Sequence, residues 1–538
     1  MQCWTAVAAW SKLVAMFPEL PASWRLALVV ALALLGGALL ALSYANYPLW
    51  WAAWLAPALA VAAVLLAPTR LRVAVGLIVG VVSGAFSFGY HVTTGSVTAA
   101  VVIAVAYALA WGSTLRLAAM AAERWPAMIA ALVLPASWAA IDTLLVHLSP
   151  HGSVGSLAYS QAGVLPLLQV ASLGGVPAVT FVLLLPGSLA GLALAQWLGR
   201  AGLRGLSQAA VLTGVVVAGV LLFGWWRLDA APSRSSTQVA MIASDRPAPG
   251  GRTWERFAAD YGAAINRAAR PGVTVLLPEA VLRTDLADSE RAAQVLAALA
   301  RDRRAMLVVG VVVKEGETVT NRALVAMPDG RRAWYVKQHL VPGLERDSTH
   351  GDRNLLVASP VAGTGVAICK DMHFPTLGRS YARDGARLML VLANDFDVDD
   401  RMMAAVTAMR GIEGGYTVAR AARHGMSFVS DPYGRIVDER RSGAAAGTLV
   451  ARAPSALATP TLYARGGDLL GWTCVAVCLG LVLATRRRRY AARPWSPEPD
   501  RSKAGPKPEA EALGVGAMSA IPPGISESRL AASGQNQP

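Results

Sequence analysis

Eight apolar runs, each close to the length of a membrane-spanning helix, constrain this sequence more than any other feature. Seven precede a long polar region and one follows it; they cover residues 23–45, 48–67, 71–92, 97–119, 126–147, 164–197, 208–226 and 467–485. About 20 helical residues cross a hydrocarbon core. Only 15% of the residues are charged, whereas soluble proteins approach about a quarter. We therefore expect a multi-span α-helical membrane protein whose sixth run is broken by proline.

The runs divide the chain into five parts. These are a cytoplasmic N-terminal segment (1–22), a membrane domain with seven spans (23–226), an extracytoplasmic domain (227–466), an eighth span (467–485) and a cytoplasmic tail (486–538). The tail is basic, rich in Pro, Glu, Ser, Gly and Arg, and poor in apolar residues. This composition predicts disorder.

The distribution of basic residues predicts the orientation of the chain in a membrane. Arginine occurs in every second connection between the first apolar runs, for example at Arg70, Arg124 and Arg204, whereas the intervening connections lack Arg and Lys. Because cytoplasmic loops are enriched in basic residues, residues 227–466 are expected outside the cytoplasm. The net charge of +15 partly reflects this asymmetry and suits anionic lipid headgroups, so nucleic acid is not expected as a partner.

The polar region alternates patterns typical of strands and helices. Continuous apolar runs that predict strands covered on both faces occur at residues 273–278, 305–313, 365–368 and 387–393. The amphipathic segment 289–304 predicts a helix. Turn signals at 328–330 and 431–439 predict hairpins. The region is therefore expected to have an α/β fold.

Cys369 is the only cysteine of the polar region and directly follows a predicted strand. The other cysteines lie at residue 3 and within the eighth run, so Cys369 has no partner there for an intrachain disulfide. A free thiol in an oxidising compartment indicates a reactive residue, although a small buried hydrophobe fits the position equally well. Two residues elsewhere in the polar region favour reactivity, because Glu279 in LLPEA supplies an acid and Lys337 in YVKQHLVP supplies a cation.

Three separated motifs, LLPEA, YVKQHLVP and ICKDMHFP, resemble those of nitrilase-type carbon-nitrogen hydrolases. Residues 157–185, the TWERF segment and Asn321 are similar to the membrane-embedded branch of that superfamily, the apolipoprotein N-acyltransferases. The resemblance covers roughly residues 20–485. It implies an α-β-β-α sandwich for residues 227–466 and a location in the bacterial cytoplasmic (inner) membrane.

The resemblance also implies functional residues and substrates. Glu279, Lys337 and Cys369 are expected to form a catalytic triad, with Glu345 and Asn321 supporting it and Trp254 contacting an acyl chain. The implied donor is a membrane phospholipid, and the implied acceptor is the α-amine of a lipid-modified N-terminal cysteine. No cofactor or metal is expected, since His339 and His373 lack the spacing of metal ligands. The chain is expected to be a monomer.

Acyl transfer through a thiol needs these residue types for reasons that do not depend on the family resemblance. A thiol with a pKa of about 8.5 is a poor nucleophile at neutral pH, so Glu279 is expected to accept its proton. Lys337 and the backbone amide of Lys370 are expected to stabilise the oxyanion. The resulting thioester is then cleaved by an amine or by water in a ping-pong scheme. Asp371 is a further supporting candidate, at a position where the acyltransferases usually carry glutamate.

Several loops depart from the acyltransferase pattern. Lys370 replaces a tyrosine, Leu277 replaces a tryptophan, PGLE replaces PFGE around Gly343, and NDFDVDD (394–400) replaces an aromatic-glycine segment. Transfer to another amine, hydrolysis by a membrane-tethered amidase, and a binding protein without catalysis therefore remain alternatives. A donor dissolved in the bilayer explains the seven preceding spans, so transfer from lipid is the leading hypothesis.

Overall fold

The computed structural model describes residues 21–491, apart from residues 45, 200–202, 230–235, 248–250, 359–360, 362 and 458. The predicted N-terminal segment up to residue 20 and the predicted disordered tail beyond residue 491 lie outside the described residues. The chain divides into two units, residues 1–484 and 485–538. The helices and sheets that position the candidate site all belong to the first unit.

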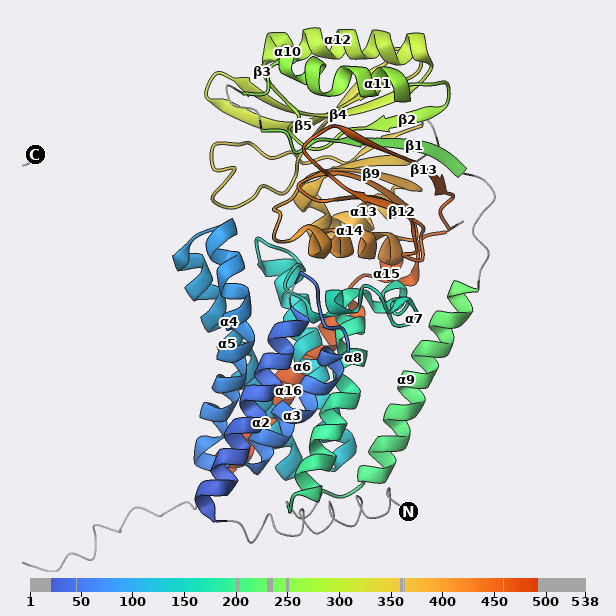
Figure 1. Ribbon diagram of the computed structural model, residues 1–538. Helices are drawn as coiled ribbons and strands as arrows, with labels where there is room; N and C mark the ends of the chain where they lie inside the picture. Colours follow the sequence, from blue (N-terminus) through green and yellow to red (C-terminus); the bar gives the residue numbers. More distant parts are fainter. Residues whose placement is uncertain are drawn as a thin grey trace, which may run out of the picture. The chain divides into compact units, whose positions relative to one another are not determined.

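A helical domain (residues 22–228) forms the first part of the described chain (Figure 1). Its elements are α2 (Ala22–Ser43), α3 (Ala52–Leu66), η2 (Thr69–Leu71), α4 (Arg72–Thr94), α5 (Val97–Arg124), α6 (Ala127–Leu148), η3 (Leu157–Gln161), α7 (Leu165–Leu168), α8 (Ala171–Trp197) and α9 (Leu206–Leu228). A last apolar helix, α16 (Leu469–Ala491), begins after the sheets. Its Cys474 packs against alanines of α6.

All eight predicted apolar runs form helices, but these helices differ in length. Within the described residues, α2, α5, α6, α8 and α9 are long and apolar enough to cross a membrane, and α4 is a sixth if its two parts, bent by 50°, count as one span. Helix α3 and the apolar part of α16 (residues 469–484) fall in the range of 10–17 residues. Eight full spans therefore stay a prediction.

The sixth apolar run is broken at glycine, so the predicted break at proline was wrong. Pro177 and Pro186 lie inside α8, whereas Gly174 and Gly175 have non-helical backbone angles, with φ of +69° at Gly175. A Cβ on Gly175 would lie 2.5 Å from ring carbons of Tyr463. The left-handed backbone and the close approach of this ring both require glycine.

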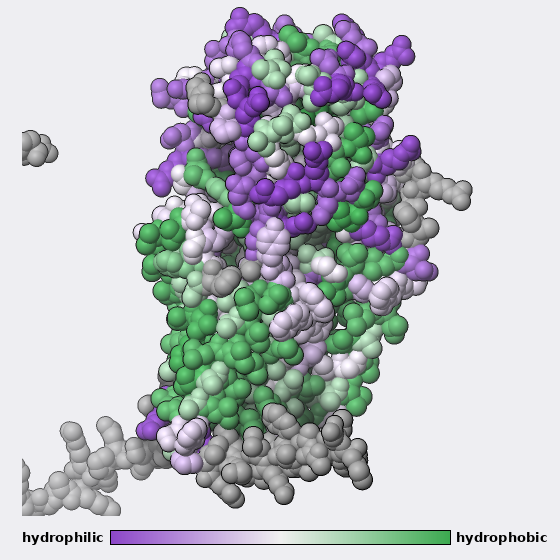
Figure 2. Space-filling view, in the orientation of Figure 1, coloured by the Kyte–Doolittle hydropathy of each residue, from purple (hydrophilic) through white to green (hydrophobic). Residues whose placement is uncertain are grey.

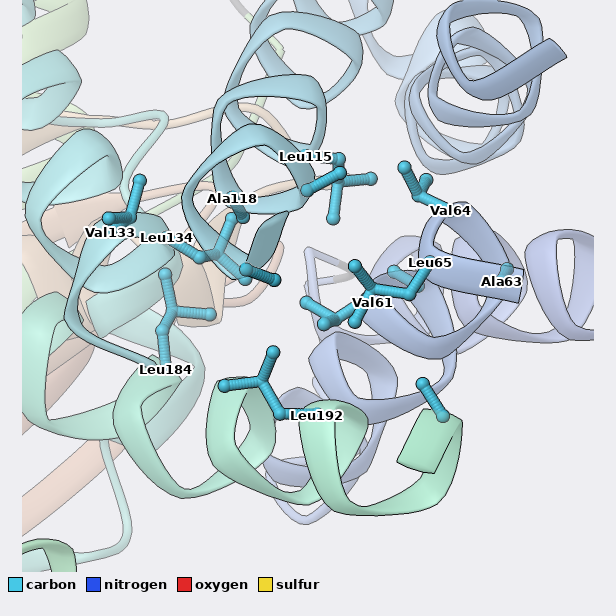
Figure 3. Close-up of a cluster of buried hydrophobic side chains, with 14 of the residues drawn as sticks. Val61, Ala63, Val64, Leu65, Leu115, Ala118, Val133, Leu134, Leu184 and Leu192 are labelled. Atoms are coloured by element: carbon cyan, nitrogen blue, oxygen red, sulfur yellow. The ribbon is translucent and has the colours of Figure 1, made fainter. Parts of the chain in front are cut away.

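Aliphatic side chains fill the centre of the helical domain. Val61, Leu65, Leu115, Leu134 and Leu184 converge from α3, α5, α6 and α8, and each is at most 4% exposed (Figure 3). Hydrophobic side chains also gather on the outside of these helices, whereas the surface over the sheets is mostly hydrophilic (Figure 2). A large apolar exterior of this kind suits contact with lipid.

Residues 236–466 form a sandwich domain of two sheets (Figure 1). The first sheet has the order β13-β1-β2-β4-β5-β6, with β3 beside β4, and the second has the order β12-β11-β10-β9-β8-β7. The strands of the first sheet are β1 (Ser236–Ala243), β2 (Val273–Leu276), β3 (Leu282–Asp285), β4 (Met306–Glu315), β5 (Thr318–Ala326), β6 (Arg332–Val336) and β13 (Gly447–Pro454). Those of the second are β7 (Leu355–Val357), β8 (Thr364–Ile368), β9 (Leu388–Asn394), β10 (Thr417–Arg423), β11 (Met426–Ser430) and β12 (Ile436–Arg441).

Helices cover the outer faces of both sheets. The first sheet is covered by α10 (Trp254–Phe257), a π-helical turn (Ala258–Gly262), α11 (Ala263–Ala268) and α12 (Leu286–Arg303). The second is covered by α13 (Pro375–Arg383), α14 (Asp400–Gly414) and α15 (Leu462–Gly466). A shared core that includes Met241, Val308, Ile368 and Leu390 joins the inner faces. The predicted α-β-β-α sandwich is confirmed.

The local patterns of the sequence agree with these elements. Strands β2, β4, β8 and β9 occupy the four predicted apolar runs, and α12 contains most of the predicted amphipathic helix. The two predicted turns lie between β5 and β6 and between β11 and β12, both of which pair antiparallel. All residues of β8 are buried, as expected for a strand covered on both faces.

The connection between α6 and η3 (residues 149–156) contacts the sandwich domain directly. Both the backbone N and the Oγ of Ser153 donate hydrogen bonds of 2.9 Å to the carbonyl oxygen of His373. A Cβ on Gly152, whose φ is +61°, would lie 2.4 Å from the same oxygen. This connection therefore packs tightly against the short helix η5 (Cys369–His373), which begins at the predicted nucleophile.

Candidate active site

A cavity of about 540 Å³ lies between the sandwich domain and helices α4 and α5. From the sandwich domain, its lining includes Glu279, Asn321, Lys337, Glu345, Cys369 and Lys370. From the helical domain, it includes Tyr90, His91, Ala99, Ile103 and His151. The structure thus brings the three predicted catalytic residues into one cavity that also borders apolar helices.

Cys369 lies at a sharp turn between β8 and η5. Its φ angle is +45°, a left-handed conformation that costs a residue other than glycine about 1–3 kcal/mol and is enriched at functional sites. Its Sγ lies 3.9 Å from the carbonyl oxygen of Asn394, at the end of the parallel neighbour β9. Burial, followed by the charge of Glu279, raises the pKa of the Cys369 thiol well above its ordinary value, although Lys337 opposes this effect. The resting thiol is therefore protonated and needs a base to react.

Lys337 lies between two carboxylates. Its Nζ donates to Glu279 Oε1 at 2.7 Å and to Glu345 Oε2 at 2.9 Å, and 1% of its side chain is exposed. Burial acts to lower the pKa of Lys337, but Glu279, Cys369 and Glu345 outweigh burial and raise this pKa above its ordinary value. Lys337 therefore remains an ammonium group in the cavity wall.

Asn321, on β5, connects the same two carboxylates. Its Nδ2 donates to Glu279 Oε1 at 2.7 Å and to Glu345 Oε1 at 2.9 Å. Glu345 also accepts a 2.7 Å hydrogen bond from the backbone N of Val341. Burial opposes ionisation of Glu345, but Lys337 and Asn321 lower its pKa. Glu345 is thus a carboxylate with both oxygens occupied, which suits it to hold Lys337 in place.

Glu279 differs from Glu345 in one respect that matters for proton transfer. The two donors that reach it, Lys337 and Asn321, both bind Oε1. Within the described part of the chain, its Oε2 accepts no hydrogen bond, while the side chain lines the cavity beside Cys369. This oxygen is available to take a proton, as a general base requires.

Asp371 links two segments of the cavity wall by hydrogen bonds. The residue is completely buried, and its Oδ1 accepts a 2.8 Å hydrogen bond from the backbone N of His339. Its Oδ2 accepts from the Tyr335 hydroxyl at 2.7 Å and from the backbone N of Ile368 at 3.0 Å. Asp371 therefore joins the turn that carries the thiol to the strand end that carries Lys337.

The remaining two predicted residues lie in different places. Lys370 lines the cavity, is 3% exposed, and donates from Nζ to the carbonyl oxygen of Leu340 at 3.0 Å. Trp254 is on α10, where its ring centroid lies 5.5 Å from that of Phe257, against the outer core of the first sheet. Trp254 is not part of the cavity lining, and its contact with an acyl chain stays a prediction.

Many cavity residues were not found from the sequence, among them Tyr90, His91, His151 and Asp399. The Tyr90 hydroxyl donates to Asp399 Oδ2 at 3.0 Å. Burial, followed by the charge of Asp395, raises the pKa of Asp399 to about 7. Among the described residues, no basic side chain forms an ion pair with Asp399. Two indirect signals of these residues were present in the sequence. One was the unusual NDFDVDD segment (394–400), and the other was the absence of Lys and Arg from the connections after the third and fifth apolar runs.

Two family models match this chain, one in each domain. The model described as "Apolipoprotein N-acyltransferase N-terminal domain" matches residues 36–189. The model described as "Carbon-nitrogen hydrolase" matches residues 261–463, which include Glu279, Lys337 and Cys369. The two matches together cover most of the helical domain and most of the sandwich domain.

Known proteins resemble the chain over both domains. The apolipoprotein N-acyltransferase of Geobacter metallireducens is 25% identical over 388 residues, which cover 66% of this chain and 74% of that protein. That of Gloeobacter violaceus is 26% identical over 362 residues, or 61% of this chain and 67% of that protein. Among solved structures, an amidase from Nesterenkonia sp. is 24% identical, with a TM-score of 0.35, and the match covers 42% of this chain and 93% of the amidase. On the two family models and the two acyltransferase relatives, the chain belongs to the apolipoprotein N-acyltransferase family.

Proposed function

We propose that this protein moves a fatty acyl chain from a membrane phospholipid, through a thioester on Cys369, to the α-amine of a lipoprotein N-terminal cysteine. One observation carries the proposal: Cys369 and the Lys337–Glu279 pair share their cavity with the ends of apolar helices α4 and α5. A soluble amide does not need such a boundary, whereas the acyl chain of a lipid must arrive from a bilayer. Membership of the family supports the same assignment.

The same features support a cellular location. The apolar helices and the family relationship identify a bacterial membrane protein. The alternation of arginine-containing and arginine-free connections supports insertion in the inner membrane with the sandwich domain on the extracytoplasmic side. Lipoprotein acceptors and phospholipid donors are both available there.

In the first half-reaction, Glu279 Oε2 takes the thiol proton of Cys369, and the sulfur attacks the ester carbonyl carbon of the lipid. A C–S bond forms, and negative charge builds on the carbonyl oxygen. The Lys337 ammonium and the backbone amide of Lys370 stabilise this charge. The ester C–O bond then breaks, and Glu279 returns the proton to the leaving alcohol oxygen of a lysophospholipid.

In the second half-reaction, a neutral amine attacks the thioester carbonyl carbon. A C–N bond forms, the C–S bond breaks, and Glu279 transfers the proton lost by nitrogen to the leaving sulfur, which regenerates the thiol. An α-amine has a pKa near 8, against about 10.4 for lysine, so a useful fraction is neutral at pH 7. This difference favours an N-terminal amine as acceptor.

Intact-mass measurement tests the proposal. The purified protein is incubated with phosphatidylethanolamine, and we expect the added mass of one acyl group, removable by hydroxylamine and located by digestion on the peptide that contains Cys369. A diacylated lipopeptide should then discharge the thioester faster than buffer alone and should gain the acyl group as an amide. Failure to find an acyl adduct would contradict the proposal. Discharge at the same rate with and without the amine would instead support the hydrolase alternative.

Asp399 is expected to bind the acceptor rather than the donor. A carboxylate without a basic partner in the cavity suits the ammonium form of an amine before it loses its proton. Asp399→Asn should therefore raise the KM for the lipopeptide by about tenfold, equivalent to about 1.4 kcal/mol, with a smaller effect on thioester formation. The ratio of the KM of the variant to that of the wild-type protein should grow as pH rises through about 7, because Asp399 ionises in this range.

Asp397→Asn is the matched control for this variant. Asp397 lies in the same loop, but its side chain is 66% exposed and is paired with Arg441. If the two variants change the KM equally, Asp399 has no specific role in acceptor binding.

A further inference from the structure

One wall of the cavity carries basic side chains from three separate segments. Lys370 and His373 come from η5, His91 comes from the end of α4, and His151 comes from the 149–156 connection. All four line the cavity that holds Cys369. The cavity therefore brings together basic side chains of the sandwich domain and of the helical domain.

Lys370 is the strongest cation of this group, and it lacks a carboxylate partner among the described residues. Its one hydrogen bond goes to the carbonyl oxygen of Leu340, although it is 3% exposed. Glu345, whose charge acts on Lys370, is hydrogen-bonded to Lys337 instead. A buried ammonium group normally requires a compensating negative charge.

The basic groups of this wall repel one another when they are protonated. Burial, followed by the charge of Lys337, lowers the pKa of Lys370 to about 8, even though Glu345 and Cys369 act in the opposite direction. Partial burial, followed by the charges of Lys370 and His91, lowers the pKa of His151. An anion bound between Lys370 and His151 would relieve this repulsion and stabilise both protonated forms.

We propose that Lys370, assisted by His151, binds the phosphodiester group of the phospholipid acyl donor. This inference rests on the proposed function and adds the site that recognises the donor headgroup. Lysine is a common phosphate ligand in proteins. The phosphodiester of such a lipid is attached to the same glycerol unit as its acyl esters, and Lys370 directly follows Cys369 in the chain. Binding the phosphate at Lys370 thus brings an ester carbonyl of the lipid to the thiol.

The bond from Lys370 to Leu340 suggests a competing role. The segment from Lys337 to Glu345 contains Leu340, so Lys370 could simply hold this segment in shape. A role of that kind would affect every acyl donor equally. Phosphate binding affects only donors that carry a phosphate, and this difference separates the two roles.

The test compares two donors with identical acyl chains, phosphatidylethanolamine and diacylglycerol, presented in the same detergent micelles. The rate of thioester formation on Cys369 is measured by intact mass for the wild-type protein, Lys370→Met and Lys370→Arg. We expect Lys370→Met to reduce the ratio of the phospholipid rate to the diacylglycerol rate by about tenfold or more, as for loss of one hydrogen bond to a charged group. Lys370→Arg should largely restore the ratio. Lys314→Met, which removes an exposed lysine of β4, is the control and should leave the ratio unchanged.

Each remaining outcome would overturn a defined part of the argument. If Lys370→Met slows both donors by the same factor, the side chain only holds the 337–345 segment, and the phosphate site is wrong. If the wild-type protein forms the thioester from both donors equally well, the phosphodiester is not recognised. If neither lipid acylates the wild-type protein, the proposed function fails, and this inference fails with it.

Discussion

Replacement of Glu279 by glutamine should lower the rate of thioester formation on Cys369 by about 10³-fold, within the range typical of general bases. Glutamine retains an oxygen that can accept from Lys337 and Asn321, so the local hydrogen bonds can persist. It cannot take the thiol proton. Because burial keeps the pKa of the Cys369 thiol high, the thiol does not ionise without help at neutral pH. The rate is measured by intact mass after mixing with phosphatidylethanolamine.

Glu345→Gln is the matched control for this substitution. Glu345 binds the same Lys337 at nearly the same distance, 2.9 Å against 2.7 Å, but each of its oxygens already accepts a hydrogen bond. We expect its replacement to slow thioester formation by about tenfold at most, because it only loosens the position of Lys337. Equal losses in the two variants would show that Glu279 acts as a structural carboxylate and that the base lies elsewhere.

The sequence predicted those features of the fold that leave a local pattern. The four apolar runs that became β2, β4, β8 and β9 are recognisable because each strand is buried on both faces. The site residues Glu279, Lys337 and Cys369 were recognisable because each follows an apolar strand pattern and lies in a motif that resembles a known family. Strands β2 and β6 belong to the first sheet and β8 to the second, so the three positions meet only because the two sheets pack face to face.

Other features depend on contacts between distant segments, which no local pattern records. His151 and Cys369 line one cavity although they are far apart in the chain. The break in the sixth run depends on the ring of Tyr463, which comes from α15; proline was the stronger local signal and therefore misled the prediction. Trp254 has an aromatic side chain at a plausible position in the sequence, but α10 packs it on the outer face of the first sheet. An isolated polar residue is thus predictable as a candidate, whereas its partners become visible only in the folded chain.

Replacement of Lys337 by methionine should have the second large effect, on both stability and chemistry. Methionine has a similar length but leaves the buried Glu279 and the partly buried Glu345 without their shared cation, and breaking a buried ion pair in this way costs about 3–5 kcal/mol. The unpaired carboxylates also repel, which should raise the pKa of at least one of them. We expect a lower Tm, measured in one detergent at one scan rate, and a loss of thioester formation of at least about 10²-fold through the missing oxyanion ligand.

The double variant Lys337→Met/Glu345→Gln separates these two effects. It removes one of the two repelling charges while Asn321 can still donate to Glu279, so part of the lost Tm should return. The rate of thioester formation should not return, because the ammonium group that faces the oxyanion is still absent. Recovery of the rate together with the Tm would mean that Lys337 serves only to neutralise the two carboxylates. Recovery of neither the rate nor the Tm would mean that the methionine itself disrupts the cavity wall. The double variant Lys337→Ala/Glu345→Gln would check this conclusion, because it also removes the bulk of the side chain.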